Sequence, residues 1–125
     1  MSENGNSKMV VVCNHADAPH VMPTLIMGAS GVGIGDDVML FFCPGGANAL
    51  VKGELEKIRE MKLKGLPDPV KLYNDIVEQG GRVILCELAL ENKGIAVEDV
   101  RDGVEVMNAP SFLLDAQGAG LSLVF

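Results

Sequence analysis

The fold is decided by the stretch Pro69-Val-Lys-Leu-Tyr-Asn-Asp-Ile-Val-Glu-Gln79, which is followed by Gly80-Gly81 and then by Arg82-Val-Ile-Leu-Cys86. Apolar side chains recur every three or four positions up to Gln79, and this spacing is typical of an amphipathic helix. Asp68 is a suitable N-cap, and the two glycines stop the helix. The residues that follow form a solid apolar run, which predicts a strand buried on both faces of a sheet.

The same alternation of helix and strand extends in both directions along the chain. Strands that are apolar on both faces need helices on both sides of a mostly parallel sheet, here of about five strands. We therefore predict a single three-layer α/β domain over residues 8–125, preceded by a flexible tail over residues 1–7. Residues 98–106 favour neither state. The strands are expected at Met9–Val12, Val38–Phe42, Arg82–Leu85 and Leu121–Phe125, and the helices at His20–Ala29, Ala47–Leu63, Pro69–Gln79, Glu87–Asn92 and Pro110–Ala116, with a glycine-rich turn at Ser30–Gly35.

The composition excludes several classes of function. The chain has 125 residues, with 10 Lys and Arg against 17 Asp and Glu, so its formal charge is −7. An acidic chain offers no electrostatic footprint for a phosphate backbone, so we expect no nucleic-acid binding. The sequence contains neither a membrane-spanning apolar stretch nor the apolar segment of a signal peptide. We therefore expect a cytoplasmic protein that does not contact a membrane.

Three cysteines follow three of the predicted strands. Cys13, Cys43 and Cys86 are 30 and 43 residues apart, so there is no close-spaced pair for zinc or for thioredoxin-like chemistry. In a reducing compartment they should be free thiols. The carboxyl ends of parallel strands lie at one edge of a sheet, where ligands bind, so the three thiols should lie on one side of the molecule. The alternative is that each cysteine is a small buried apolar residue beside its strand.

Cys86 is the strongest candidate for chemistry. It lies between a strand and the start of a helix, where unpaired N–H groups and the helix dipole favour a thiolate over a thiol. The neighbouring carboxylate of Glu87 would oppose this effect if it pointed inward, and the sequence does not fix its direction. Cys43 opens the turn Cys43-Pro-Gly-Gly46, whose glycines are suited either to close approach of an anion or to an ordinary loop. His15 could orient or deprotonate a neighbouring thiol such as Cys13, or lie in solvent.

Cofactor and metal sites are not indicated. The glycines of Gly31-Val-Gly-Ile-Gly35 follow a predicted helix, whereas a dinucleotide-binding loop follows a strand and opens a helix. Three Cys and one His could form a zinc site, but structural zinc sites usually use close-spaced ligand pairs. A serine hydrolase is not signalled, because the chain has no GxSxG turn. We therefore expect no cofactor and no metal.

Most of the basic residues fall in one segment. Six of the ten lie between Lys52 and Lys71, interleaved with glutamates that are suited to ion pairs along a helix. The segment is either a solvated helix face or a docking surface for an acidic partner protein. The six residues are Lys52, Lys57, Arg59, Lys62, Lys64 and Lys71.

Several blocks in the second half of the chain resemble the DsrE/DsrF-like family, which includes the TusD-like sulfur relay proteins. The resemblance covers nearly the whole chain after residue 7, and the order of the blocks carries it. They are Met61-Lys-Leu-Lys-Gly-Leu-Pro-Asp-Pro69, Gly80-Gly-Arg-Val-Ile-Leu-Cys86-Glu-Leu-Ala-Leu-Glu-Asn-Lys-Gly94 and Glu98-Asp-Val-Arg-Asp-Gly-Val-Glu-Val-Met-Asn-Ala-Pro-Ser-Phe-Leu113. The resemblance implies a flavodoxin-like fold and assembly into trimers or hexamers. It also implies that Cys86 matches the family's active cysteine, whereas Cys13, Cys43 and His15 match no family signature.

Two hypotheses follow from these observations. The first is an intracellular sulfur-transfer protein that holds sulfane sulfur on Cys86 as a persulfide or thiosulfonate. Its partners would be sulfur donor and acceptor proteins, with Cys43 or Cys13 as a second thiol if either lies close enough. The second is an oligomeric binding or scaffold module of the same fold without covalent chemistry. Family members that lack the active cysteine motivate the second hypothesis.

Overall fold

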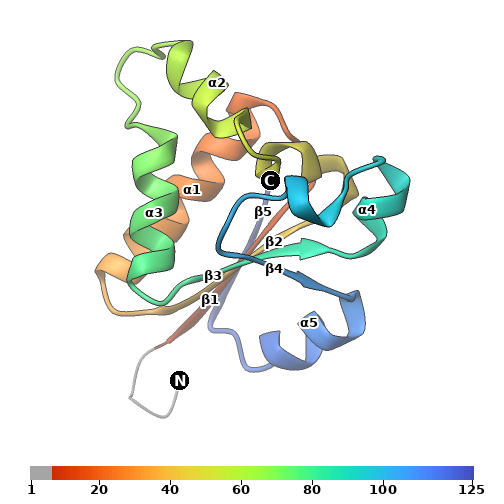
Figure 1. Ribbon diagram of the computed structural model, residues 1–125. Coiled ribbons are helices and arrows are strands. Elements are labelled where there is room, and N and C mark those ends of the chain that lie inside the picture. The colour runs from red at the N-terminus through yellow and green to blue at the C-terminus, as the bar shows by residue number, and fades with distance from the viewer. Residues whose placement is uncertain (1–6) are drawn as a thin grey trace.

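Five parallel strands form the centre of the molecule (Figure 1). They lie in the order β4-β3-β2-β1-β5, and each neighbouring pair is parallel. The computed structural model describes residues 7–125, so the predicted tail lies almost wholly outside the described residues. The strands are β1 (Lys8–Cys13), β2 (Asp37–Phe42), β3 (Arg82–Cys86), β4 (Val104–Met107) and β5 (Leu121–Val124).

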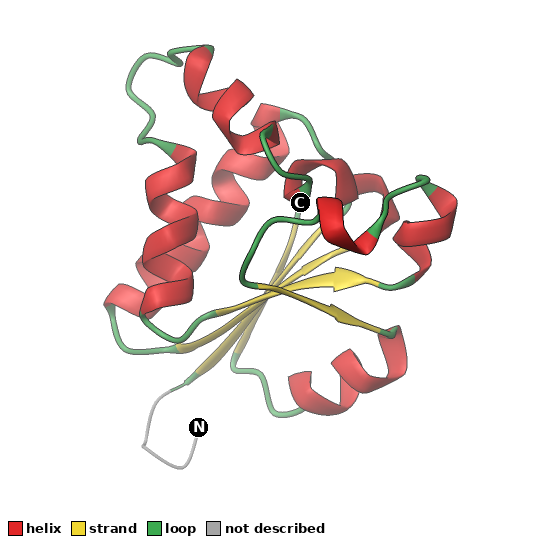
Figure 2. Ribbon diagram, viewed as in Figure 1, coloured by secondary structure: helices red, strands yellow, loops and turns green. Residues whose placement is uncertain are grey.

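Helices cover both faces of the sheet, but unequally (Figure 2). Strands β1 to β4 follow one another in a single direction across the sheet, and β5 returns to the far side of β1. Because crossover connections are right-handed, the returning helix must lie on the opposite face from the earlier helices. No helix within residues 7–125 is long and apolar enough to span a membrane. One face of the sheet is covered by α1 (Ala18–Gly33), α2 (Glu54–Glu60) and α3 (Pro69–Glu78), and the other face by α5 (Ala109–Ala116). The short helix α4 (Leu88–Asn92) follows β3. Two further segments, η1 (Pro44–Leu50) and η2 (Val97–Asp99), are 3₁₀ turns.

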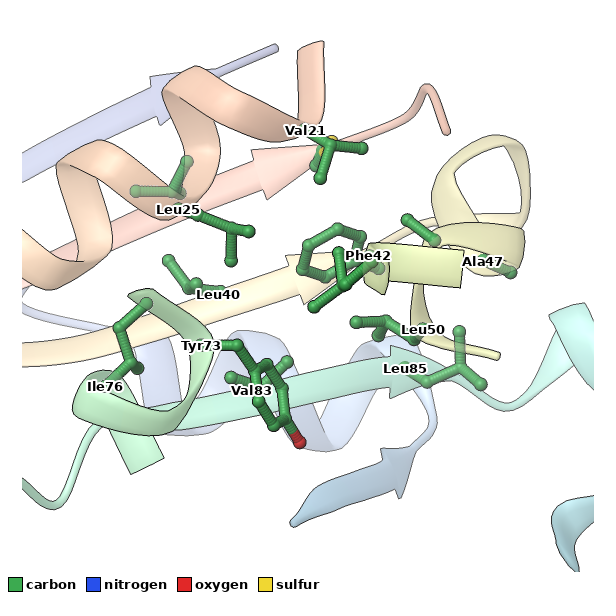
Figure 3. Packing of buried hydrophobic residues seen from close by; sticks show 14 of the residues in the cluster. Val21, Leu25, Leu40, Phe42, Ala47, Leu50, Tyr73, Ile76, Val83 and Leu85 are labelled. Atoms are coloured by element: carbon green, nitrogen blue, oxygen red, sulfur yellow. The ribbon is translucent and has the colours of Figure 1, made fainter. Parts of the chain in front are cut away.

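The larger core lies between the sheet and the α1 face (Figure 3). Alternate side chains of each strand point toward α1 and α3, as the two-residue period of a strand requires. Leu25 of α1 and Ile76 of α3 are fully buried against Leu40 of β2. Other members of this core include Val11, Val21, Phe42, Leu50, Val83 and Leu85.

The opposite face has a smaller core, covered by α5. Phe112 of α5 stacks on Phe41 of β2 with ring centroids 4.1 Å apart. The next two residues of the helix, Leu113 and Leu114, are 61% and 68% exposed, so α5 buries only one stripe. Asn108 caps the helix by accepting a hydrogen bond from the Ser111 N–H. The buried members of this core are Val10, Met39, Phe41, Ile84, Cys86 and Phe112.

A polar cluster joins α2 and α3 to the segment before β4. The Arg101 guanidinium donates hydrogen bonds to both carboxylate oxygens of Glu56 and lies 5.2 Å above the ring of Tyr73. The Tyr73 hydroxyl donates to the carbonyl of Asp102. Burial raises the pKa of Tyr73 to about 12, because the phenolate would be poorly solvated there.

The sequence placed the end of the first helix too early. The glycine-rich turn predicted at Ser30–Gly35 is helical up to Gly33. A β-carbon on Gly31 would lie 2.7 Å from the Met9 side chain and 2.8 Å from Val38, so this glycine lets the helix pack closely on the sheet. A glycine inside a helix therefore serves close packing here rather than a turn.

The helix predicted at Ala47–Leu63 is two separate elements. The 3₁₀ turn η1 ends at Leu50, and α2 begins only at Glu54. Between them Gly53 has a φ of 90°, and Val51 forms a β-bridge with Val100, so the chain leaves the helical path. The unassigned residues 98–106 contain the end of η2 and most of β4.

Candidate functional site

Cys43 and Cys86 lie on the same face of the sheet at its carboxyl edge. In the β2–β3 ladder Phe42 pairs with Leu85, so the next residue of each chain segment is Cys43 and Cys86. Both cysteines belong to the smaller core under α5, together with Met107 and Phe112. Cys43 and Cys86 therefore share both the carboxyl edge and one face of the sheet.

Cys86 is nearly inaccessible to solvent. It is the last residue of β3 and is 4% exposed. Glu87 is exposed, so its carboxylate lies outward rather than in the core. The helix that follows, α4, has only five residues, and the Glu87 N–H is already bonded to the Met107 carbonyl. Such a short helix supplies little dipole, so the helix-based argument for a stabilised Cys86 thiolate loses most of its force.

Cys43 is the more accessible member of the pair. It lies directly after β2 and is half-buried. Burial raises the pKa of the Cys43 thiol, and the neighbouring Cys86 and Cys13 raise it further, because a second thiolate nearby is unfavourable. A shallow depression of about 510 Å³ is lined by Pro44, which follows Cys43, and by Leu88, Glu91 and Asn92 of the segment after Cys86. The residues that follow the two cysteines therefore form an open surface at the carboxyl edge of the sheet.

Cys13 lies at the same edge but on the opposite face of the sheet. It is fully buried in the larger core under α1. Its thiol donates to the carbonyl oxygen of His15 at 3.2 Å. The His15 imidazole instead stacks on that of His20, with ring centroids 3.9 Å apart, and His20 is held by Asp17. The structure therefore does not give His15 the contact with Cys13 that a base would need.

The glycine loop after Cys43 packs on the end of β1. A β-carbon on Gly46 would lie 2.7 Å from the Cys13 carbonyl oxygen, and one on Gly45 would lie 2.3 Å from that of Asn14. The Gly45 N–H donates to the Asn14 side chain, and the Gly46 N–H donates to the Cys43 carbonyl. Both N–H groups donate within the protein, so these two groups are not free to hold an anion. The segment after Cys43 is therefore an ordinary loop.

The remaining candidate features lie away from the two thiols. Within residues 7–125 no three His, Cys, Asp or Glu side chains are grouped so as to hold a metal ion. All six basic residues of the Lys52–Lys71 segment are exposed. Lys57 is paired with Glu54 and Lys71 with Asp75, as expected for a solvated helix face.

Comparison with known proteins identifies the fold. No protein-family model matches the chain. The crystal structure of the YchN protein from E. coli superposes with a TM-score of 0.76 at 20% identity, over 95% of this chain and 99% of that one. The protein of unknown function MTH1491 from Methanobacterium thermoautotrophicum gives a TM-score of 0.72 at 14% identity, over 96% and 100%. Both superpose over almost the whole chain, so the predicted α/β fold with a parallel five-stranded sheet is confirmed.

A curated relative matches part of the chain. The uncharacterized protein MJ0760 of Methanocaldococcus jannaschii is 32% identical over 74 residues, which are 59% of this chain and 26% of that protein. The chain thus spans about a quarter of the length of this relative.

The sequence missed the residues that cover Cys86. Phe112 and Met107 pack in the same core as the thiol. The helix over residues 110–116 was predicted, but its position depends on where β5 lies in the sheet. That strand order has no local sequence signal.

Proposed function

We propose that the protein carries sulfane sulfur on Cys86 and passes it to the thiol of a partner protein. The placement of Cys86 beside Cys43, at the strand edge where α/β proteins bind ligands, is the observation that supports this function. The position of Cys86 in the block that resembles the DsrE/DsrF-like family is consistent with it, as is the fold shared with the YchN protein. We further propose that the protein works in the cytoplasm as a homo-oligomer, a trimer or hexamer, between a sulfur donor and a sulfur acceptor.

The proposed chemistry needs only a thiolate and a sulfane sulfur. The Cys86 thiolate attacks the sulfane sulfur of a donor persulfide, and the donor leaves as a thiolate. The protein then holds Cys86–S–S⁻. When an acceptor thiolate attacks the outer sulfur, the sulfur–sulfur bond breaks and Cys86 is released as a thiolate. Because Cys86 is 4% exposed, a donor must approach through the depression beside Leu88 or by displacement of α5.

Mass spectrometry of the polysulfide-treated protein tests this function. The reduced protein is incubated with inorganic polysulfide, capped with iodoacetamide and digested. We expect the mass of one additional sulfur atom on the peptide that contains Cys86, and its loss in Cys86→Ser. Cys13→Ser is the matched control and should load like the wild type, because Cys13 lies on the other face of the sheet. Loading that does not map to Cys86, or that persists in Cys86→Ser, would contradict the proposal.

The burial of Cys86 favours a second candidate, a non-catalytic oligomeric binding or scaffold module. A thiol that is 4% exposed is also what a structural cysteine looks like. Such a module would use the exposed basic residues between Lys52 and Lys71 to bind an acidic partner. An iodoacetamide titration separates the two functions. A Cys86 that reacts only when the protein unfolds supports the scaffold, and a Cys86 that reacts in the folded protein supports sulfur transfer.

A further inference from the structure

The two thiols of the candidate site are spaced for a bond with each other. Neighbouring strands of a sheet lie about 4.7–4.9 Å apart, and Cys43 follows in the register that pairs Phe42 with Leu85. Disulfides form between residues whose α-carbons are about 4.4–6.8 Å apart and whose β-carbons point the same way. The ladder spacing carried one residue beyond the Phe42–Leu85 pair falls within this range of α-carbon distances. Both side chains lie in the core under α5, so they also point to the same face.

Cys13 meets neither the direction nor the surroundings that such a bond needs. Its side chain points to the α1 face, and its thiol donates to the carbonyl oxygen of His15. The backbone of the sheet lies between Cys13 and the other two thiols, although the Cys43 N–H bonds to the Cys13 carbonyl. Cys43 is therefore the only one of the other two cysteines that can form a disulfide with Cys86.

We infer that Cys43 is the resolving thiol of Cys86 and forms a reversible disulfide with it, which discharges the bound sulfur as hydrogen sulfide. The discharge step rests on the proposed loading of Cys86. The Cys43 sulfur attacks the inner sulfur of Cys86–S–S⁻, and the bond between the two persulfide sulfurs breaks. The outer sulfur leaves with the electron pair and takes the Cys43 proton, as HS⁻. The sulfane sulfur is reduced, and the two cysteines are oxidised to a disulfide.

The disulfide is returned to two thiols by a dithiol reductant, which is itself oxidised. Parallel strands hold neighbouring β-carbons roughly 5 Å apart, slightly more than the roughly 3.5–4.5 Å of a relaxed disulfide. Cys43 lies one residue beyond β2, outside the β2–β3 ladder, so the small approach falls on a loop residue rather than on a paired strand. A bond closed under such strain is easily reduced, as a catalytic or regulatory disulfide must be.

The two thiols divide the roles of loading and resolving. Burial and the neighbouring thiols raise the pKa of Cys43, so the Cys43 thiol keeps its proton at neutral pH. Cys43 therefore does not compete with Cys86 for the incoming sulfur and becomes the attacking group only after loading. This division of roles depends on their being side by side on one face of the sheet.

The first arm of the test does not involve sulfur loading. The reduced wild-type protein is treated with glutathione disulfide, and the digest is analysed for linked peptides. We expect a Cys43–Cys86 disulfide that a dithiol reductant removes, in wild type and in Cys13→Ser alike. Absence of this link under conditions that oxidise a model dithiol, or a link from Cys86 to Cys13, overturns the inference, even if Cys86 carries sulfur.

The second arm measures hydrogen sulfide released after polysulfide loading and removal of excess reagent. Wild type and Cys13→Ser should release sulfide as the Cys43–Cys86 disulfide appears. In Cys43→Ser, release should slow by at least about tenfold, because an intramolecular thiol attacks at a far higher effective concentration than one in solution. Equal release in wild type and Cys43→Ser overturns the resolving role. If Cys86 takes up no sulfur in any variant while the first arm gives the disulfide, the carrier function and the discharge step are wrong, and only the reversible Cys43–Cys86 disulfide stands.

Discussion

Replacing Phe112 by alanine tests whether α5 alone protects the Cys86 face of the sheet. Phe112 is 5% exposed and stacks on Phe41 with ring centroids 4.1 Å apart. Truncation of a buried Phe to Ala costs about 3–5 kcal/mol, of which the aromatic pair accounts for roughly 0.5–1.5 kcal/mol. Small domains are stable by about 5–15 kcal/mol, so this change removes a large fraction of the total. We expect Phe112→Ala to fold with much reduced stability.

The matched control is the next residue of the same helix. Leu113 is 61% exposed, so Leu113→Ala should change the free energy of unfolding by no more than about 0.5 kcal/mol. Urea unfolding measured by circular dichroism gives both values. In the same samples iodoacetamide should modify Cys86 faster in Phe112→Ala than in Leu113→Ala, since the thiol shares its core with Phe112. Similar stabilities for the two variants, or unchanged alkylation of Cys86, would refute the idea that α5 seals this face.

Three further predictions concern backbone packing and titration. Gly46→Ala should destabilise the protein by about 1–3 kcal/mol, because the new β-carbon meets the backbone of Cys13. Gly33→Ala should stabilise it by about 0.4–1 kcal/mol, because nothing lies within 4 Å of the new β-carbon. Thermal unfolding of the two variants measures both effects. The folded-state pKa of Tyr73, about 12, lies above its ordinary value of 10.0, so its contribution is present below pH 10.0 and is lost as the pH rises toward 12. The loss amounts to roughly 2–3 kcal/mol, and a urea series over this range should show it in wild type but not in Tyr73→Phe. Burial acts to raise the pKa of Glu56, but hydrogen bonds from Arg101 outweigh it and hold the pKa below 4.5. The stability that Glu56 contributes is therefore present above pH 4.5 and is lost as the pH falls through the folded-state pKa. In Glu56→Gln the free energy of unfolding should fall less over this acidic range than in the wild type.

Much of the fold is predictable from the sequence, because it depends on local patterns. Solid apolar runs mark β1, β2 and β3. The capped helix predicted at Pro69–Gln79 is α3, which runs from Pro69 to Glu78. The errors occur where a long-range contact overrides a local signal. Gly31 lies inside α1 where the helix packs on Met9 of β1 and Val38 of β2, and these contacts leave no room for a side chain.

The candidate site was predictable in part. Each cysteine falls at the carboxyl end of a predicted strand, and this places Cys43 and Cys86 at one edge of the sheet. The face on which each thiol lies depends on whether the cysteine falls at an odd or an even position of its strand. If the start of a strand is predicted one residue too early or too late, the thiol is predicted on the wrong face. The burial of Cys86 depends on α5, which comes from the far end of the chain and crosses the sheet to reach this face.

The separation of Cys13 from the other two thiols has a consequence for reading related sequences. Cys13 pairs with Phe42 in the ladder, one step before Cys43, and that single step puts the two cysteines on opposite faces. Inserting or deleting one residue within a strand would exchange the faces without altering the number of cysteines. Related proteins that keep all three cysteines can therefore differ in their thiol chemistry. What distinguishes them is the face of the sheet on which each cysteine lies, which depends on whether it is an odd or an even number of residues from the start of its strand.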